Sequence, residues 1–107
     1  MTYYITEVAS NWINGKIQNY NSNKYINKYD PHTGKQLTKI VDSTPEMVDK
    51  AVDVAFHTID RWSGLSPIYR GQILSNIVLQ MKKNANELAK CISLEVGKPL
   101  SDAVSEV

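Results

Sequence analysis

From Thr44 onward, the apolar residues of this chain recur at intervals of three and four positions, and the spacing continues to the last residue. This spacing places apolar side chains on one face of an α-helix. Thr44–Pro45 and Ser66–Pro67 each combine a residue that caps a helix N-terminus with a proline suited to the first turn. The pattern predicts amphipathic helices that need a packing partner. Their apolar faces are Val48, Ala51, Val52, Ala55, Ile59 and Trp62; Ile73, Leu74, Ile77 and Met81; Ala85, Leu88, Ala89, Ile92 and Val96; and Leu100, Ala103, Val104 and Val107.

Residues at the ends of these segments divide them into about four helices. Gly64 is placed to end the first helix and Gly97 the third, because glycine adopts the backbone conformations that terminate helices. Asn84, with Glu87 three residues later, resembles a capping box and predicts a restart or bend. Lys98–Pro99 opens the last helix, which has no later glycine or proline and is expected to be truncated before it ends.

Residues before the helices have the features of short strands and tight turns. Asn14–Gly15 suits the two positive φ angles of a type I′ turn and predicts a small hairpin. Tyr25–Tyr29 and Gln36–Val41 are predicted strands, joined by the turn-forming segment Asp30–Lys35. Asn19–Lys24 is polar and turn-like. Such strands need a sheet to join.

Three regions follow from this pattern. Residues 1–10 are expected to be a tail and residues 11–43 a hairpin and strand region. Residues 44–107 are expected to be the helical part. A chain of 107 residues with 42% hydrophobic and 21% charged residues fits one globular unit.

Charge and cysteine content exclude several classes of function. A net charge of +1 supplies no strong field to attract nucleic acid or an anionic membrane. One cysteine cannot build a disulfide framework, and there is no basic, apolar leader and no run near the roughly 18 apolar residues that span a bilayer. We therefore expect a cytoplasmic protein that does not bind nucleic acid or membranes.

The order of these motifs is similar to that of the aldehyde dehydrogenase superfamily. In that family an aromatic-x-Asn-Gly hairpin precedes an Asn-Pro-Ala-Thr-Gly-Glu turn, from which this chain departs at Asp30, His32 and Lys35. Each motif alone is weak, whereas about six in register are specific. The matching segments are Trp12–Lys16, Asp30–Lys35, Val48–Val52 through Trp62, Arg70 with Ile73–Leu74, Leu88–Ala89, and Glu95–Pro99 with Glu106–Val107.

Within the family, three segments look most like the succinate-semialdehyde dehydrogenase branch. They are Tyr69–Leu74, Glu95–Leu100 and Glu106–Val107. The resemblance implies an α/β parent fold with a Rossmann-like cofactor domain that binds NAD or NADP, in a longer, homo-oligomeric chain. This chain would be its amino-terminal strand region and first helices. Its partner would be the remainder of that fold, or another copy by self-association.

The resemblance also implies that the nucleophilic Cys, the general-base Glu, the oxyanion-stabilising Asn and the Gly-rich cofactor turn lie in later segments. No catalytic or cofactor-binding residue is therefore expected here. Cys91 lies among the apolar positions of a helix without oxyanion donors beside it, which favours a structural thiol over a nucleophile. His32 and His57 have no second ligand at metal-binding spacing and are expected at the surface. Trp12 and Trp62 are expected as core anchors.

Glu95 is the candidate metal ligand. The resemblance implies that the acidic residue before Gly97 takes part in a monovalent-cation site with backbone carbonyls near the Asp30–Pro31 turn, and oxygen ligands suit a hard cation. The structural alternative, which the residue types favour, is an ion pair with Lys98 or Arg70. Arg70 opposes the helix dipole and is expected to be held by a carboxylate elsewhere in the fold.

Two hypotheses for function remain. The first is an amino-terminal fragment of an NAD(P)-dependent aldehyde dehydrogenase, inactive by itself and belonging to a parent that oxidises an aldehyde such as succinate semialdehyde. The second is a non-enzymatic helical module or pseudogene product that binds a partner dehydrogenase chain. A Gly-rich turn and a catalytic Cys encoded downstream of Val107 would favour the first.

Overall fold

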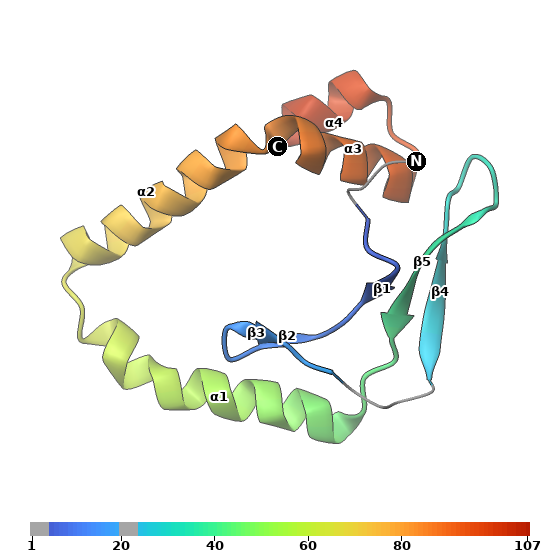
Figure 1. Ribbon diagram of the computed structural model, residues 1–107. Coiled ribbons are helices and arrows are strands. Elements are labelled where there is room, and N and C mark those ends of the chain that lie inside the picture. Colours follow the sequence, from blue (N-terminus) through green and yellow to red (C-terminus); the bar gives the residue numbers. More distant parts are fainter. Residues whose placement is uncertain (1–4, 20–23) are drawn as a thin grey trace.

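The computed structural model describes residues 5–19 and 24–107, so residues 1–4 of the predicted tail and most of the turn-like segment Asn19–Lys24 lie outside the described residues. Five short strands precede four helices (Figure 1). The strands are β1 (Val8–Ala9), β2 (Trp12–Ile13), β3 (Lys16–Ile17), β4 (Tyr25–Tyr29) and β5 (Gln36–Val41). The helices are α1 (Pro45–Ser63), α2 (Pro67–Lys83), α3 (Ala85–Val96) and α4 (Leu100–Glu106).

The two predicted strands and both predicted turns are confirmed. β4 and β5 pair antiparallel over the predicted residues, and Gly34 in their turn has a φ of 68°. β2 and β3 form the hairpin, where Asn14 and Gly15 have φ values of 57° and 72°. Two successive positive φ angles define the type I′ geometry, which matches the twist of a two-stranded ribbon.

A strand inside the predicted tail is the first departure. Val8–Ala9 form β1, which pairs parallel with β5 and completes a three-stranded sheet of order β1-β5-β4. Thr38 of β5 holds the preceding residues in place, since its buried hydroxyl donates to the carbonyl oxygen of Thr6 at 2.6 Å. The pairing is made by backbone groups and one hydroxyl, which leave no apolar pattern in the sequence.

The helix starts follow the predicted caps. The Thr44 hydroxyl accepts from the backbone N–H of Met47 at 3.3 Å, and the Ser66 hydroxyl accepts from that of Tyr69 at 3.1 Å. Gly97 ends α3 with a φ of 72°, a left-handed conformation that costs glycine little.

The capping box predicted at Asn84 is wrong. Asn84 has φ −106° and ψ 17°, whereas an N-cap residue that receives N–H groups on its side chain has extended backbone. Its side-chain amide instead donates to the carbonyl oxygen of Gln80 at 2.8 Å. Asn84 therefore completes the end of α2, and α3 begins at the next residue without a side-chain cap.

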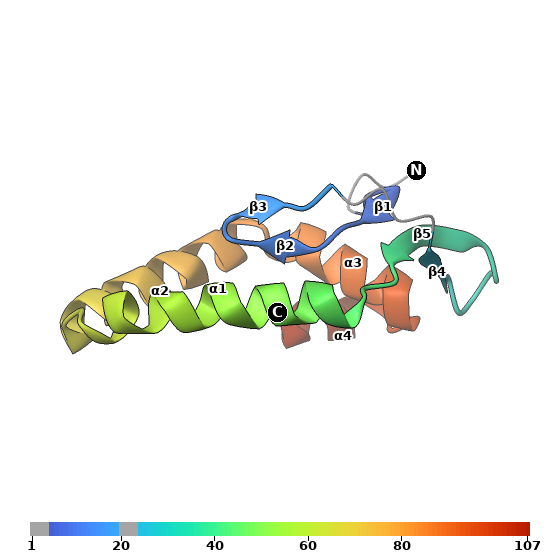
Figure 2. The ribbon, with the colours of Figure 1, turned by 90° about the horizontal axis from the view of Figure 1, so that it is seen from below.

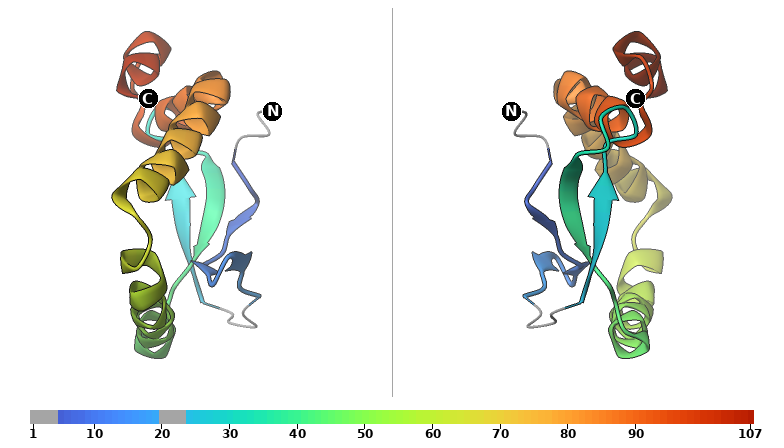
Figure 3. Two further views of the ribbon diagram at one scale, coloured as in Figure 1. Left: turned by 90° about the vertical axis from the view of Figure 1, so that its left-hand side faces the viewer. Right: turned by 90° about the vertical axis from the view of Figure 1, so that its right-hand side faces the viewer.

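The helices form an open frame. α1 and α2 diverge from the connection at residues 64–66, and α3 and α4 pack at the opposite corner (Figure 1). Seen from below and from the sides, the β2–β3 hairpin and β1 lie on one side of the helical layer (Figures 2 and 3). The predicted core anchors Trp12 and Trp62 are 68% and 39% exposed, because the described residues supply no layer over them. The apolar pattern therefore identified faces without identifying what covers them.

Candidate functional site

The turn between β4 and β5 contacts the corner between α3 and α4. The Nε2 of His32 donates to the carbonyl oxygen of Gly97 at 3.0 Å. A Cβ atom at position 97 would lie 3.0 Å from the Cγ of Pro31 and 3.2 Å from the Nε2 of His32. Gly97 is therefore required here twice, for its positive φ and for the close approach of the turn.

Hydrogen bonds to Asp30 fix the turn itself. Its carboxylate accepts from the backbone N–H of His32 at 2.8 Å and from that of Thr33 at 3.4 Å. Its carbonyl oxygen accepts from Gly34 at 2.8 Å. The N–H of His32, followed by smaller contributions that include Thr33, lowers the pKa of Asp30, although slight desolvation opposes this. Asp30 thus fulfils the turn-forming role of the Asn in the family motif.

The corner between α3 and α4 is closed by its own polar contacts. The Ser93 hydroxyl donates to the carbonyl oxygen of Lys98 at 2.8 Å, and the Lys98 ammonium is ion-paired with Glu106. The predicted ion pair between Glu95 and Lys98 is therefore wrong. Glu95 is exposed in the last turn of α3, two residues before Gly97.

Among the described residues, Arg70 has no carboxylate partner. Its Nε is buried, with no hydrogen-bond partner, and no described carboxylate forms an ion pair with it. The alternative pairing of Glu95 with Arg70 is therefore wrong as well. Within residues 5–19 and 24–107, no three or more His, Cys, Asp or Glu side chains group as a metal site.

Cys91 has the setting of a structural thiol. The side chain is half-buried in α3. Burial, followed by the carboxylates of Glu95 and Glu87, raises the pKa of the thiol. A nucleophilic cysteine needs the opposite environment, one that stabilises the thiolate.

His57 is exposed, as predicted, and its polar contacts with the described residues lie along its own helix. Its Nδ1 donates to the carbonyl oxygen of Asp53 at 2.8 Å and lies 3.4 Å from the Asp53 carboxylate. Both side chains are more than two-thirds exposed. A side-chain contact so exposed contributes little to stability.

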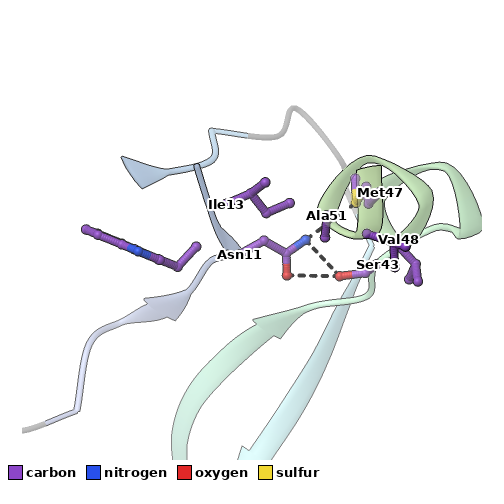
Figure 4. A pocket seen from close by; sticks show the side chains of 8 residues that line it. Asn11, Ile13, Ser43, Met47, Val48 and Ala51 are labelled. Atoms are coloured by element: carbon purple, nitrogen blue, oxygen red, sulfur yellow. Dashed lines mark hydrogen bonds between the residues drawn. The ribbon is translucent and has the colours of Figure 1, made fainter. Parts of the chain in front are cut away.

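An apolar pocket between the hairpin and α1 was not predicted (Figure 4). It has a volume of about 230 Å³, and Asn11 and Ser43 lie at its base. The Asn11 amide nitrogen donates to the Ser43 hydroxyl at 2.9 Å and approaches the Met47 sulfur at 3.7 Å. These contacts position the hairpin on α1. No local signal could have revealed them, because Asn11 and Ser43 are 32 positions apart.

The chain is similar in sequence to known proteins of one family. The model of the aldehyde dehydrogenase family matches residues 17–107. Over 96 residues, or 90% of this chain, the chain is 30% identical to a betaine aldehyde dehydrogenase of Rhizobium etli and 33% identical to a D-glyceraldehyde dehydrogenase (NADP(+)) of Thermoplasma acidophilum. It spans 20% of the length of each of these relatives.

Solved structures show the same fold. Lactaldehyde dehydrogenase from Escherichia coli superposes with a TM-score of 0.90 over 92% of this chain and 21% of its own, at 26% identity. A Sinorhizobium meliloti structure complexed with NAD, described as a methylmalonate-semialdehyde dehydrogenase, superposes over the whole chain and 21% of its own with a TM-score of 0.87, at 26% identity. No helix among the described residues is long and apolar enough to cross a membrane. The strand region followed by four helices confirms the expected fold class, and the chain belongs to the aldehyde dehydrogenase family.

Proposed function

We propose that this chain forms the first part of an NAD(P)-dependent aldehyde dehydrogenase, which oxidises an aldehyde to a carboxylic acid. The contact between His32 and Gly97 carries the proposal, because it joins two of the motifs of the family resemblance, Asp30–Lys35 and Glu95–Pro99. The match over residues 17–107, on about a fifth of the relatives' length, supports it. Relatives with NADP(+) in the name or NAD in the structure support the cofactor class.

In this proposal the chain supplies structure and the later segments supply the chemistry. The raised pKa of Cys91 supports this division, since a protonated thiol does not attack a carbonyl. The parent enzyme would be a cytoplasmic homo-oligomer, and the remainder of the fold would be the partner of this segment. A reducing compartment suits a chain with one cysteine.

We propose succinate semialdehyde as the substrate of the parent enzyme. The proposal depends on the segments Tyr69–Leu74 and Glu95–Leu100, which resemble that branch. The relatives are named for betaine aldehyde, D-glyceraldehyde and methylmalonate semialdehyde, and these three compounds share only the aldehyde group. The assay that tests this proposal measures the activity of the proposed parent enzyme on succinate semialdehyde and on these three aldehydes.

A chimera tests the proposed function. Residues 17–107 would replace the matching segment of the Thermoplasma acidophilum D-glyceraldehyde dehydrogenase, and reduced NADP would be followed by its absorbance. We expect a folded chimera that retains the host's activity on D-glyceraldehyde, whereas the 107-residue chain by itself shows no turnover and no saturable NAD(P) binding. A chimera that folds but is inactive, beside an active host carried through the same cloning, would contradict the proposal.

We also propose that Glu95 contributes to a monovalent-cation site in the intact enzyme. The contact of Gly97 with Pro31 and His32 supports this proposal. Glu95 precedes Gly97 by two residues, so it lies near the backbone carbonyls of that turn. In the 107-residue chain, exchanging Na⁺ for K⁺ at constant ionic strength should leave the melting curve unmoved. In the active chimera the same exchange should change activity, and Glu95→Gln should abolish that sensitivity. An ion-insensitive chimera would refute the site.

A further inference from the structure

The turn of the β2–β3 hairpin places an exposed asparagine directly before an exposed glycine. Asn14 and Gly15 form the only Asn-Gly pair in the sequence. None of the hydrogen bonds among the described residues involves the Asn14 side chain. A Cβ added at Gly15 would meet nothing within 4 Å. The side-chain amide of Asn14 and the backbone nitrogen of Gly15 are therefore both accessible to water.

An asparagine followed by glycine can react with its own backbone. The N–H of Gly15 loses its proton to hydroxide, and its nitrogen attacks the Cγ of Asn14. The N–Cγ bond forms, the Cγ–Nδ2 bond breaks, and the amide leaves as ammonia with a proton from water. Water then opens the succinimide ring: attack at Cγ gives aspartate, and attack at the main-chain carbonyl carbon gives isoaspartate. Glycine favours ring closure, because it has no Cβ to crowd the attacking nitrogen.

The closed turn opposes this ring closure. Asn14 and Gly15 have φ values of 57° and 72°, and the pairing of Ile13 with Lys16 holds the two residues in the turn. In type I′ geometry the ψ of the first residue is about 30°. That angle turns the nitrogen of Gly15 away from the Cβ of Asn14, whereas a five-membered ring needs both on the same side of the Cα–C bond. The ring therefore forms only when the turn opens.

A few contacts hold the hairpin closed and docked on α1. Asn11 and Ser43 exchange two hydrogen bonds, at 2.9 and 3.1 Å. The Gln18 side chain donates to the carbonyl oxygen of Ile13 at 2.9 Å and accepts from the Lys50 ammonium of α1 at 3.3 Å. β2 and β3 have two residues each, and a two-stranded hairpin by itself is marginally stable. The opening of the turn therefore depends on these contacts.

We propose that Asn14 is a site of spontaneous deamidation, and that the docking of the hairpin on α1 sets the rate. The reagents are water and hydroxide, so no other protein is needed. Isoaspartate adds one carbon to the main chain inside a two-residue turn. Ile13 and Lys16 then lose the register in which they pair, and the hairpin detaches from α1.

Ageing of the 107-residue chain at pH 8 tests the site. Trypsin releases residues 1–16 as one peptide, because Lys16 is the first Lys or Arg of the chain. This peptide also contains Asn11, which precedes Trp12 and serves as the internal control. Tandem mass spectrometry should locate the exchange of amide for carboxyl at Asn14, and mainly as isoaspartate. Equal conversion of Asn11 and Asn14, or no conversion of Asn14 in the chain unfolded by guanidinium chloride, would overturn the site.

Matched serine variants test the role of docking. Ser43→Ala removes the hydroxyl that binds Asn11, whereas Ser93→Ala removes a hydroxyl contact at the distant corner between α3 and α4. Deamidation of Asn14 should be about tenfold or more slower in the folded chain than in the unfolded one. Ser43→Ala should raise the folded-state rate about threefold or more, and Ser93→Ala should leave it unchanged.

A second variant covers the case in which Ser43→Ala loses its far-UV helix signal. Gln18→Ala removes the link between Ile13 and Lys50 without touching α1, and it should raise the rate in the same way. Equal rates in the folded and unfolded chains would overturn the role of docking. Equal responses to the hairpin variants and to Ser93→Ala would overturn it as well.

Discussion

The Nε2 of His32 donates to the carbonyl oxygen of Gly97 across 65 positions of sequence, at 3.0 Å. This contact ties the tip of the β4–β5 hairpin to the corner where α3 gives way to α4. Few other contacts connect the strand region to the last two helices, whereas α1 and α2 span the frame on its other side (Figure 1). The position of the strand region relative to α3 and α4 therefore depends on a small set of atoms.

Replacing Gly97 should disrupt this junction. Gly97→Ala forces a side chain into a φ of 72° and brings its Cβ to 3.0 Å from Pro31. We expect a loss of about 1–2 kcal/mol in the free energy of unfolding, measured by urea denaturation followed by circular dichroism. Gly71→Ala is the matched control, because a Cβ there meets nothing within 4 Å and alanine favours the helix interior. Equal losses in both variants would contradict the role assigned to Gly97.

Removing the Thr38 hydroxyl should release β1. In Thr38→Val the hydroxyl donor that lies 2.6 Å from the carbonyl oxygen of Thr6 and 3.1 Å from that of Glu7 is removed, while the shape of the side chain is kept. We expect a cost of about 1–3 kcal/mol and faster hydrogen exchange at the backbone N–H of Lys39, which is bonded to the carbonyl of Glu7. Unchanged exchange at Lys39 would show that β1 is held without this hydroxyl.

The Asp30 turn should weaken in acid. Backbone N–H groups, that of His32 above all, hold the pKa of Asp30 below its ordinary value. A carboxyl whose folded pKa is lowered stabilises the fold above its unfolded pKa, about 4, and loses that contribution as pH falls through the folded value. Asp30→Asn should therefore melt below the unmodified chain at pH 7, and the two melting temperatures should converge as the pH falls below the lowered pKa of Asp30. A difference in melting temperature that persists in acid would show that the charge of Asp30 is not what stabilises the turn.

Cys91 should react slowly with thiol reagents. Because its pKa is raised by burial and by the carboxylates of Glu95 and Glu87, a smaller fraction is thiolate at any pH below that value. A disulfide reagent at pH 8 should modify it more slowly than it modifies an unstructured peptide with the same local sequence. Removing both charges in Glu87→Gln with Glu95→Gln should raise the rate. No change in the double variant would leave burial as the cause.

Local chemistry explains what was predictable from sequence. Asn14–Gly15 requires no information beyond its own two residues, because few other pairs adopt two positive φ angles. Thr44 and Gly97 are similar, since cap residues act on backbone groups within four positions. The bounds of β4 and β5 followed from the turn residues that separate two strand-forming segments.

Long-range partners explain what was missed. β1 is held by backbone groups of residues about thirty positions away, and Asn11 meets Ser43 over a similar separation. Arg70 was expected to meet a carboxylate, which the described residues do not provide. At Asn84 the residue types matched a cap, but the backbone there is not extended. In each case the outcome depends on what lies nearby in space, which a single sequence does not specify.

The parallel pairing of β1 with β5 has a consequence for synthesis. An antiparallel hairpin such as β2–β3 can form as soon as its few residues have left the ribosome, because its strands are adjacent in the chain. Val8 and Ala9 have to wait for Lys39 and Ile40, their partners in the sheet. β1 therefore joins its sheet only after β5 has been synthesised, about thirty residues later.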